Sequence, residues 1–275
     1  MASLFVYKKD KVLLHASYVC LSFDGIPILH NINLTIRDII RPGAIQGQIV
    51  ALLGPSGIGK TQLFKILAGM RKPTSGTVLV TEQLIPVRAG MVGVVAQTYP
   101  LFKNRTVLSN LMIAAQLRGH AKADAKAKAL EALALYGLTE KAGMYPRQLS
   151  GGQRQRVAIA QQILSSEHFL LMDEPFSGLD PVMKDRACDA ILKMSQLDEL
   201  NTVIVVTHDI ASAVTIADTV WLMGRVRQAD GTVMGATIIK EYDLIERGLA
   251  WHPDITKTPE FQSTMIEIRN DFNLC

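Results

Sequence analysis

A glycine-rich run in the first quarter of the chain has the composition of a phosphate-binding loop: Gly54-Pro55-Ser56-Gly57-Ile58-Gly59-Lys60-Thr61. Backbone N–H groups at the start of a helix attract anions, and glycine lets this backbone approach a phosphate closely. Lys60 would neutralise charge on the β- and γ-phosphates, and the Thr61 hydroxyl would hold Mg²⁺. The sequence therefore predicts that this run binds a nucleoside triphosphate.

A second glycine-rich loop, Leu149-Ser150-Gly151-Gly152-Gln153, also stands at the start of a predicted helix. One such loop suffices to bind a nucleotide. Two of them suggest that a triphosphate is gripped from two sides, which makes ATP-driven work on another molecule the leading hypothesis.

Two carboxylates end an apolar run, Phe169–Met172, that has the length of a buried strand. Asp173 has the placement expected of a carboxylate that orients Mg²⁺ through water. Glu174 would lie beside the γ-phosphate and polarise the attacking water as a general base. The alternative is a solvent-facing acidic pair that caps the strand, and the phosphate loop favours the catalytic interpretation.

Two further polar residues follow predicted strands. Gln97 comes after Gly93–Ala96 and would offer an amide oxygen to Mg²⁺ or to water, and His208 comes after Val203–Val206. Taken alone, a polar residue after a strand is usually an ordinary polar residue, and a lone histidine is more often structural than catalytic. In open α/β sheets ligands lie beyond the carboxyl ends of the strands, so a shared sheet edge favours a functional role for both.

The elements that must hold these residues indicate an α/β fold. Ile49–Leu53 is typical of a strand buried on both faces, and Gln62–Ala68 continues the phosphate loop as an amphipathic helix. A helix over Val182–Leu197 separates the last two strands. Near the N-terminus, Leu13–Ile36 alternates apolar and polar residues around Asp24-Gly25, which predicts antiparallel strands joined by a turn.

Weaker patterns divide the rest of the chain. Further strands are predicted over Thr77–Val80 and Met91–Ala96, helices over Thr106–Tyr136, and a loop over Arg37–Gln48. The tail from Leu244 onward is weakly patterned.

The bulk properties exclude several classes of protein. The net charge of +4, without a dense run of Lys and Arg, argues against a nucleic-acid partner. Cys20, Cys188 and Cys275 are scattered and are expected to be reduced thiols of a cytosolic protein. Met1–Lys11 lacks the apolar core of a secretory signal, and no apolar stretch is long enough to span a membrane. We expect any membrane role to be exerted through a partner.

The motifs, taken in order, resemble those of the nucleotide-binding subunit of ATP-binding-cassette (ABC) transporters over about Tyr18 to Gly224. Leu149–Gln153, which follows Tyr145-Pro146-Arg147-Gln148, is similar to the family's signature loop. The other matches are the Q-loop at Gln97, the D-loop at Ser177-Gly178-Leu179-Asp180 and the switch histidine at His208. Phe23 stands where the family places an aromatic ring that stacks on adenine, the alternative being a plain strand aromatic.

The resemblance implies a P-loop NTPase cassette that forms a single ABC ATPase domain over residues 1–275. Residues 1–98 and 165–243 would form a RecA-like core with a mixed sheet and an N-terminal antiparallel β subdomain. Residues 99–164 would be the inserted α-helical signature subdomain, and residues 244–275 a C-terminal tail.

The resemblance also implies that the two glycine-rich loops work in different subunits. Ser150, Gly151 and Gly152 would close on the γ-phosphate held by a second ATPase subunit, most simply an identical copy. Asp180 would cross this interface. His208 would contact the γ-phosphate, and Gln97 would relay closure to transmembrane permease subunits.

The implied function is ATP hydrolysis that energises transport, most simply import of a small polar solute delivered by a solute-binding protein. The chain would act peripherally, at the cytoplasmic face of the cell membrane. Three alternatives stay open: an export-type complex, a soluble ABC ATPase that acts on a macromolecule, and a different phosphate-loop enzyme such as a nucleotide kinase or GTPase.

Two departures from the family pattern stand out. Gln62 occupies the position where the family has a second hydroxyl residue, and its amide would donate to an α-phosphate oxygen. The segment Asp38–Gln46 is longer than the usual connection, and we interpret it as a surface loop, the alternative being a partner contact.

Overall fold

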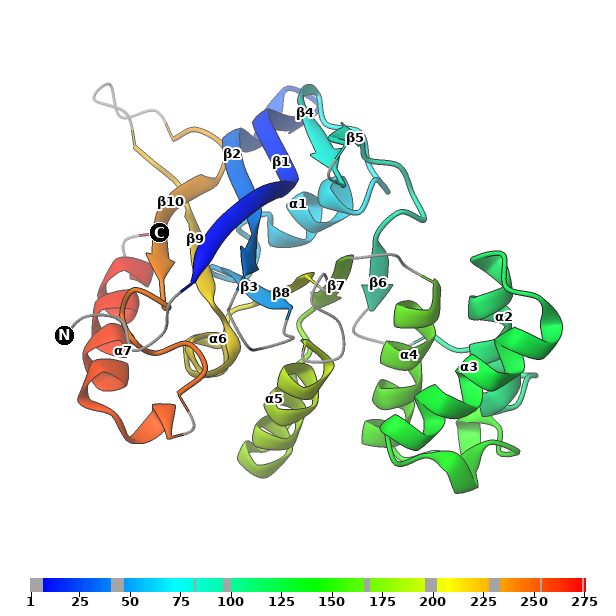
Figure 1. Ribbon diagram of the computed structural model, residues 1–275. Helices are drawn as coiled ribbons and strands as arrows, with labels where there is room; N and C mark the ends of the chain where they lie inside the picture. The colour runs from blue at the N-terminus through cyan, green and yellow to red at the C-terminus, as the bar shows by residue number, and fades with distance from the viewer. Residues whose placement is uncertain are drawn as a thin grey trace.

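The computed structural model describes residues 7–40, 47–81, 83–95, 100–165, 169–195, 202–227, 233–252, 254–273 and 275, whose strands form two sheets (Figure 1). The first sheet is antiparallel, in the order β2 (Ile26–Ile40), β1 (Lys8–Phe23), β4 (Ser75–Val80) and β5 (Ile85–Pro86). The second is mixed, in the order β10 (Thr237–Asp243), β9 (Thr219–Gly224), β3 (Gln48–Leu53), β8 (Thr202–Thr207), β7 (Phe169–Asp173) and β6 (Gly93–Val95). Its strands run parallel except for β10, which pairs antiparallel with β9.

The central strands of the second sheet are apolar because both of their faces are covered. Every residue of β3 and of β8 is buried. The parallel register pairs Leu53 with Thr207 and Asp173 with Val206. The phosphate loop, the two carboxylates and His208 therefore emerge at the same edge of the sheet.

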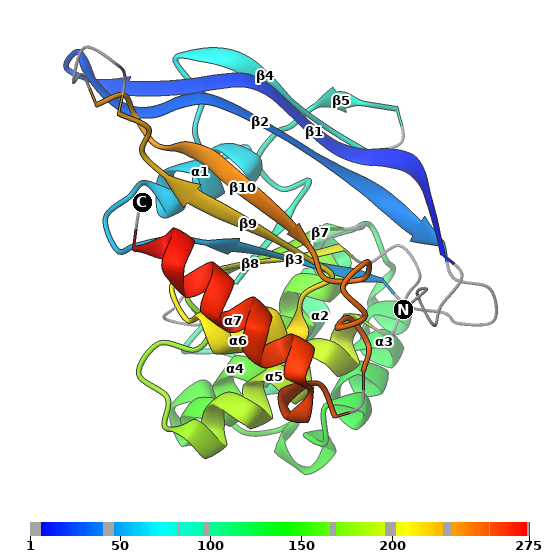
Figure 2. The ribbon, with the colours of Figure 1, turned by 90° about the vertical axis from the view of Figure 1, so that its left-hand side faces the viewer.

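Helices cover both faces of this sheet. Helix α1 (Lys60–Leu67) lies between the two sheets, where its Leu63, Phe64 and Leu67 share one hydrophobic core with β1, β2, β3 and β9 (Figure 2). The other face is covered by α5 (Pro181–Ser195), α6 (Ile210–Ile216) and α7 (Pro259–Phe272) (Figure 1).

The remaining helices pack to one side of the sheet (Figure 1). They are α2 (Val107–Leu117), α3 (Lys122–Leu135), α4 (Gly151–Ser165) and the 3₁₀ turns η1 (Thr139–Lys141) and η2 (Pro146–Gln148). Their apolar residues, among them Leu111, Leu133 and Val157, form a separate core. The α/β fold with an antiparallel β part and a helical part is thus confirmed, and the boundaries between the parts stay predictions.

Among the described residues, no helix combines the length and apolar character that crossing a bilayer requires.

Two segments differ from the sequence-based expectation. Strand β2 continues to Ile40, where a loop was expected from Arg37, because Ile39 and Ile40 pair with Lys9 and Lys8 of β1. The tail from Leu244 is also ordered: it contains η3 (Ile255–Lys257) and α7, which Thr258 caps by accepting a hydrogen bond from the Phe261 N–H at 3.2 Å. Only three residues of α7 are buried, so its apolar stripe is narrow and the sequence pattern weak.

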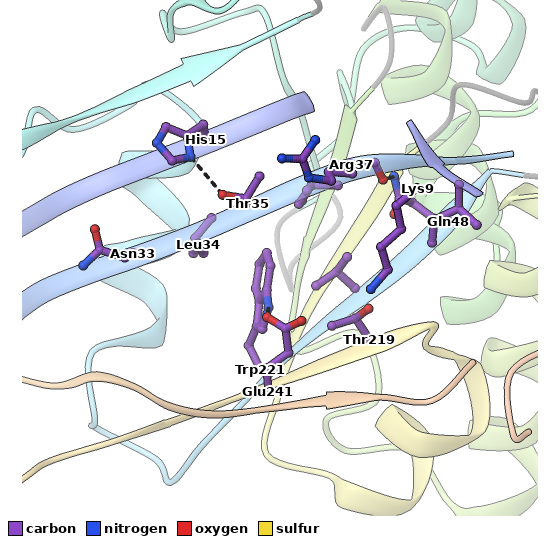
Figure 3. Close-up of a pocket in the computed structure, with 13 residues that line it drawn as sticks. Lys9, His15, Asn33, Leu34, Thr35, Arg37, Gln48, Thr219, Trp221 and Glu241 are labelled. Carbon is purple, nitrogen blue, oxygen red and sulfur yellow. Dashed lines mark hydrogen bonds between the residues drawn. The ribbon is translucent and has the colours of Figure 1, made fainter. Parts of the chain in front are cut away.

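A crevice of about 400 Å³ opens where β2 and β10, the edge strands of the two sheets, diverge (Figure 3). At its floor the Trp221 indole donates a hydrogen bond to Glu241 Oε2 at 3.0 Å. The ammonium of Lys9, on the rim, pairs with Asp243 at 2.7 Å. None of the residues predicted to carry chemistry lines this crevice.

Candidate functional site

The phosphate loop connects the end of β3 to the start of α1. A Cβ atom at Gly54 would lie 2.8 Å from the Met223 carbonyl oxygen of β9, so only glycine fits there. Gly59, the residue before α1, has a φ of 116°, a conformation that side-chain-bearing residues rarely adopt. No side chain caps α1. The Gln62 N–H donates to the Gly59 carbonyl oxygen at 2.9 Å, and the N–H groups of Lys60 and Thr61 are placed to bind an anion.

Lys60 is folded into this loop. Its side chain is 6% exposed, and its Nζ donates to the carbonyl oxygens of Gly54 at 2.7 Å and Pro55 at 3.0 Å. Glu174 Oε1 lies 3.6 Å from the same Nζ. Burial lowers the pKa of Lys60, and the charge of Glu174 opposes that shift. A buried ammonium that faces carbonyl oxygens and a single carboxylate suits a triphosphate, which would bring further negative charge to it.

Asp173 forms a hydrogen bond with the Thr61 side chain and interacts electrostatically with Lys60. Burial and the neighbouring Glu174 raise the pKa of Asp173, while Lys60 and a hydrogen bond with the Thr61 hydroxyl oppose the rise. The Oδ1 atom of Asp173 is buried and accepts no hydrogen bond. A carboxylate oxygen without a partner, next to a hydroxyl, is the type of ligand that a hard divalent cation takes, so the residues present fit such an ion.

Glu174 is held in a strained turn after β7. Its φ of 50° lies in the left-handed region, and its N–H donates to the Val206 carbonyl oxygen at 2.8 Å. Its Oε2 lies 2.9 Å from His208 Nδ1 and accepts a hydrogen bond from Thr207 Oγ1 at 3.4 Å. Strain of this kind is held at functional sites by the surrounding contacts. The carboxylate is thereby aimed between Lys60 and His208, at the edge where the γ-phosphate is predicted.

The signature loop is built differently. The Ser150 N–H donates to Gln153 Oε1 at 2.9 Å and the Gln153 N–H donates to Ser150 Oγ at 3.3 Å, a reciprocal cap at the start of α4. Gly151 is exposed, and a Cβ there would meet no atom within 4 Å. Among the described residues, none of this loop's hydrogen bonds reaches the phosphate loop. Within one chain the two loops are not brought together.

The other predicted residues lie at the ends of helices and strands. Asp180 caps α5, its Oδ1 accepting the Met183 N–H at 2.9 Å.

Phe23 ends β1 and is 37% exposed, and the Arg71 guanidinium lies 4.9 Å from its ring centroid. An exposed ring beside a cation suits stacking on a nucleobase. Arg71 was not anticipated, because nothing in the local sequence ties it to Phe23.

Two predicted residues complete the set. Gln62 lies in the first turn of α1, and its Oε1 atom is buried without a hydrogen-bond partner. Gln97 lies outside the described residues. Its predicted role is therefore untested.

No role was assigned to Thr207 or to Lys184 from the sequence. Thr207 is buried, and its hydroxyl links two residues: it donates a hydrogen bond to Glu174 Oε2 and accepts one from the Asp209 N–H at 3.1 Å. Lys184 of α5 forms an ion pair with Asp209. The only sequence signal was the polar cluster that follows β8, and no signal singled out Lys184.

A family model described as ABC transporter matches residues 30–177. The chain belongs to this family. The resemblance predicted from the motifs is thus confirmed.

Its relatives include ATP-binding proteins of import systems. A sulfate/thiosulfate import ATP-binding protein of Synechococcus elongatus is 37% identical over 227 residues, which cover 80% of this chain and 63% of that protein. The L-cystine transport ATP-binding protein TcyN of Escherichia coli is 36% identical over 210 residues, which cover 71% of this chain and 80% of that protein. The chain spans 53% to 63% of the length of the sulfate/thiosulfate relatives.

Solved structures share the fold. CbiO1 of Clostridium perfringens, part of the ABC transporter complex cbiONQ, has a TM-score of 0.72 at 22% identity, over 96% of this chain and 99% of that one. The cassette MJ0796, a dimer bound to ADP and Pi, has a TM-score of 0.66 at 27% identity, over 84% of this chain and 99% of that one.

Proposed function

We propose that this chain is the ATP-hydrolysing subunit of an ABC transporter and that it powers import of a small polar solute through separate membrane subunits. The observation that carries the proposal is the cluster of Lys60, Asp173, Glu174 and His208 at one sheet edge, beside an uncapped helix start. The import-type relatives support the direction of transport, because their names state sulfate/thiosulfate import and L-cystine transport.

The chain's own groups divide the work of hydrolysis. The N–H groups of α1 and the Lys60 ammonium would bind the β- and γ-phosphates. Glu174 would accept a proton from the attacking water, and His208, which now holds the Glu174 carboxylate, would turn its imidazole toward the γ-phosphate. Thr61 and Asp173 would hold Mg²⁺ together with Gln97, and the ion, when bound, would supply charge that stabilises the phosphate oxygens.

The second glycine-rich loop implies a second subunit. Ser150, Gly151 and Gly152 stand at a capped helix start that lies apart from the phosphate loop of its own chain. Ser150 and Gly151 are exposed, and Gly152 is half-buried. A second copy, turned head to tail, would bring them to that loop. The dimeric state of the MJ0796 cassette with ADP and Pi supports this arrangement.

The proposed partners in the membrane would bind beside the Gln97 segment. A groove of about 620 Å³ is lined by Gly93 and Pro100, described residues on either side of Gln97 in the sequence, and by the apolar Leu101, Phe102 and Ile113. Phe102 is 53% exposed and Leu117 is 78% exposed. Exposed apolar side chains around a groove are typical of a protein-binding surface. Docking there would place the chain peripherally at the cytoplasmic face, with a solute-binding protein on the opposite side.

The test of the proposed function is ATP hydrolysis by the purified chain and by Glu174→Gln. The wild type should release phosphate from ATP in the presence of Mg²⁺. The variant should bind ATP as tightly as the wild type, hydrolyse it roughly 10²- to 10⁴-fold more slowly, and accumulate as an ATP-bound dimer in size-exclusion chromatography. Turnover by the variant close to the wild-type rate would contradict the role of Glu174 as base.

A further inference from the structure

Lys184 and Asp209 join two helices that begin beside the candidate site. Lys184 lies in the first turns of α5, just after the D-loop, and Asp209 is the residue before α6. Their side chains form an ion pair and are 34% and 18% exposed. None of the roles derived so far uses this pair.

Asp209 is held on three sides. Its Oδ2 pairs with Lys184, and its Oδ1 accepts the Ser212 N–H at 2.9 Å, which caps α6. Its own N–H donates to Thr207 Oγ1 at 3.1 Å. Burial acts to raise the pKa of Asp209, but the hydrogen bonds from Lys184 and Ser212 outweigh burial and lower it. The carboxylate is therefore ionised at neutral pH.

These contacts continue into the candidate site. Thr207 Oγ1 donates to Glu174 Oε2 at 3.4 Å, and His208, between Thr207 and Asp209 in the chain, lies 2.9 Å from the same oxygen. A shift of Asp209 is therefore expected to move the turn that carries both contacts of Glu174 Oε2.

The same contacts reach the D-loop at the other end. The Lys184 N–H donates to the Asp180 carbonyl oxygen at 2.9 Å, and the Asp180 side chain caps the same helical turn. A single polar chain thus runs from Asp180 through Lys184, Asp209 and Thr207 to Glu174.

We propose that Lys184 is a positioning residue for ATP hydrolysis: it fixes Asp209, and through it the Thr207–His208 turn, and so couples the seating of the D-loop on a second subunit to the orientation of Glu174. The inference rests on the proposed function and adds a residue to it. Lys184 would act through other groups, because its ammonium pairs with Asp209.

The test uses Lys184→Met, which keeps most of the aliphatic stem but leaves Asp209 without its cation. We expect kcat for ATP to fall about 10- to 100-fold, as small displacements of catalytic groups do, while KM and the Kd for ATP change less than about twofold. Lys184→Arg should keep at least about half of the wild-type kcat, because it restores the charge. Lys193→Met, an exposed lysine at the end of the same helix, is the matched control and should change nothing.

A second variant tests whether Lys184 acts on hydrolysis through Asp209. Asp209→Asn keeps an oxygen for the Ser212 N–H but loses the ion pair, so it should match Lys184→Met in kcat, and the double variant should be no slower than either single one. Additive losses, or a kcat for Lys184→Met equal to that of the wild type, would overturn the inference while wild-type hydrolysis still upheld the proposed function. An inactive wild type would instead refute the proposed function itself.

Discussion

The two glycine-rich loops both lead into helices, yet the helices start in opposite ways. Helix α1 begins at a left-handed glycine with no side-chain cap, and the buried Lys60 lies across the loop. Helix α4 begins with a reciprocal cap between Ser150 and Gln153, and its first residue, Gly151, faces open space. The first loop carries a cation of its own, whereas Leu149–Gln153 carries no charged residue.

This difference assigns different tasks to the loops. An uncapped start with a lysine can bind a phosphate within one chain. A neutral, capped and exposed start is already stable without a ligand, so it suits a phosphate that another molecule presents. The comparison therefore favours two composite sites, each shared between two copies.

The largest effect is expected at the loop that carries its own cation. Lys60→Ala should weaken ATP binding about 10- to 100-fold, because a charge-assisted contact to phosphate is lost. Isothermal titration calorimetry measures this, with Lys65→Ala on the same helix as the control. An unchanged Kd for ATP would contradict the role of the first loop.

The capped loop should respond in the opposite way. Gly151→Asp places a carboxylate where the partner's γ-phosphate is predicted, so we expect ATP binding within about twofold of the wild type but loss of most hydrolysis. Mixing this variant with Lys60→Ala should restore hydrolysis that neither shows alone, because one composite site is then intact. No recovery on mixing, with heterodimers verified by pull-down, would show that the two loops do not meet between chains.

A smaller effect is expected at the proposed adenine platform. Phe23→Ala should weaken ATP binding about 3- to 10-fold through lost stacking, and should leave binding of inorganic tripolyphosphate unchanged. Ile26→Ala, an exposed apolar neighbour in the β1–β2 hairpin, is the control. If the substitution weakened binding of ATP and of tripolyphosphate equally, Phe23 would have a structural role and would not stack on the adenine base.

The smallest effect is expected on α7, at a residue outside both loops. Hydrogen bonds from Arg247 and Lys240 lower the pKa of Glu267 to about 2, from an ordinary value of 4.5. Because the folded-state pKa is depressed, the stability it contributes is present above about pH 4.5 and is lost as the pH falls toward 2. Glu267→Gln should lower the midpoint of urea unfolding at pH 6, and its difference from the wild type should shrink toward pH 3. A constant difference would show that Glu267 acts through packing.

The sequence predicts those parts of the site that local patterns encode. Apolar runs followed at once by Asp173-Glu174 or His208 predict strand ends, and a parallel sheet then aligns these ends by geometry alone. Contacts between distant residues leave no such pattern. Arg71 reaches Phe23 and Lys184 reaches Asp209 only after the helices have packed. The sequence did not predict helix α7 for a related reason: its few buried residues pack against α6 and the sheet, which are distant in the sequence.

The crevice between the two sheets holds a tryptophan, Trp221, that could report nucleotide binding by its fluorescence. Trp221 is 2% exposed and hydrogen-bonded to Glu241, and Met223, two residues further along β9, presses its carbonyl oxygen against Gly54. An indole with so little exposed surface and a hydrogen bond to Glu241 should emit at short wavelength, and its emission should respond when a nucleotide shifts Gly54, which Met223 contacts. With Trp251, the other tryptophan, replaced by phenylalanine, binding could be followed in unlabelled protein by fluorescence alone.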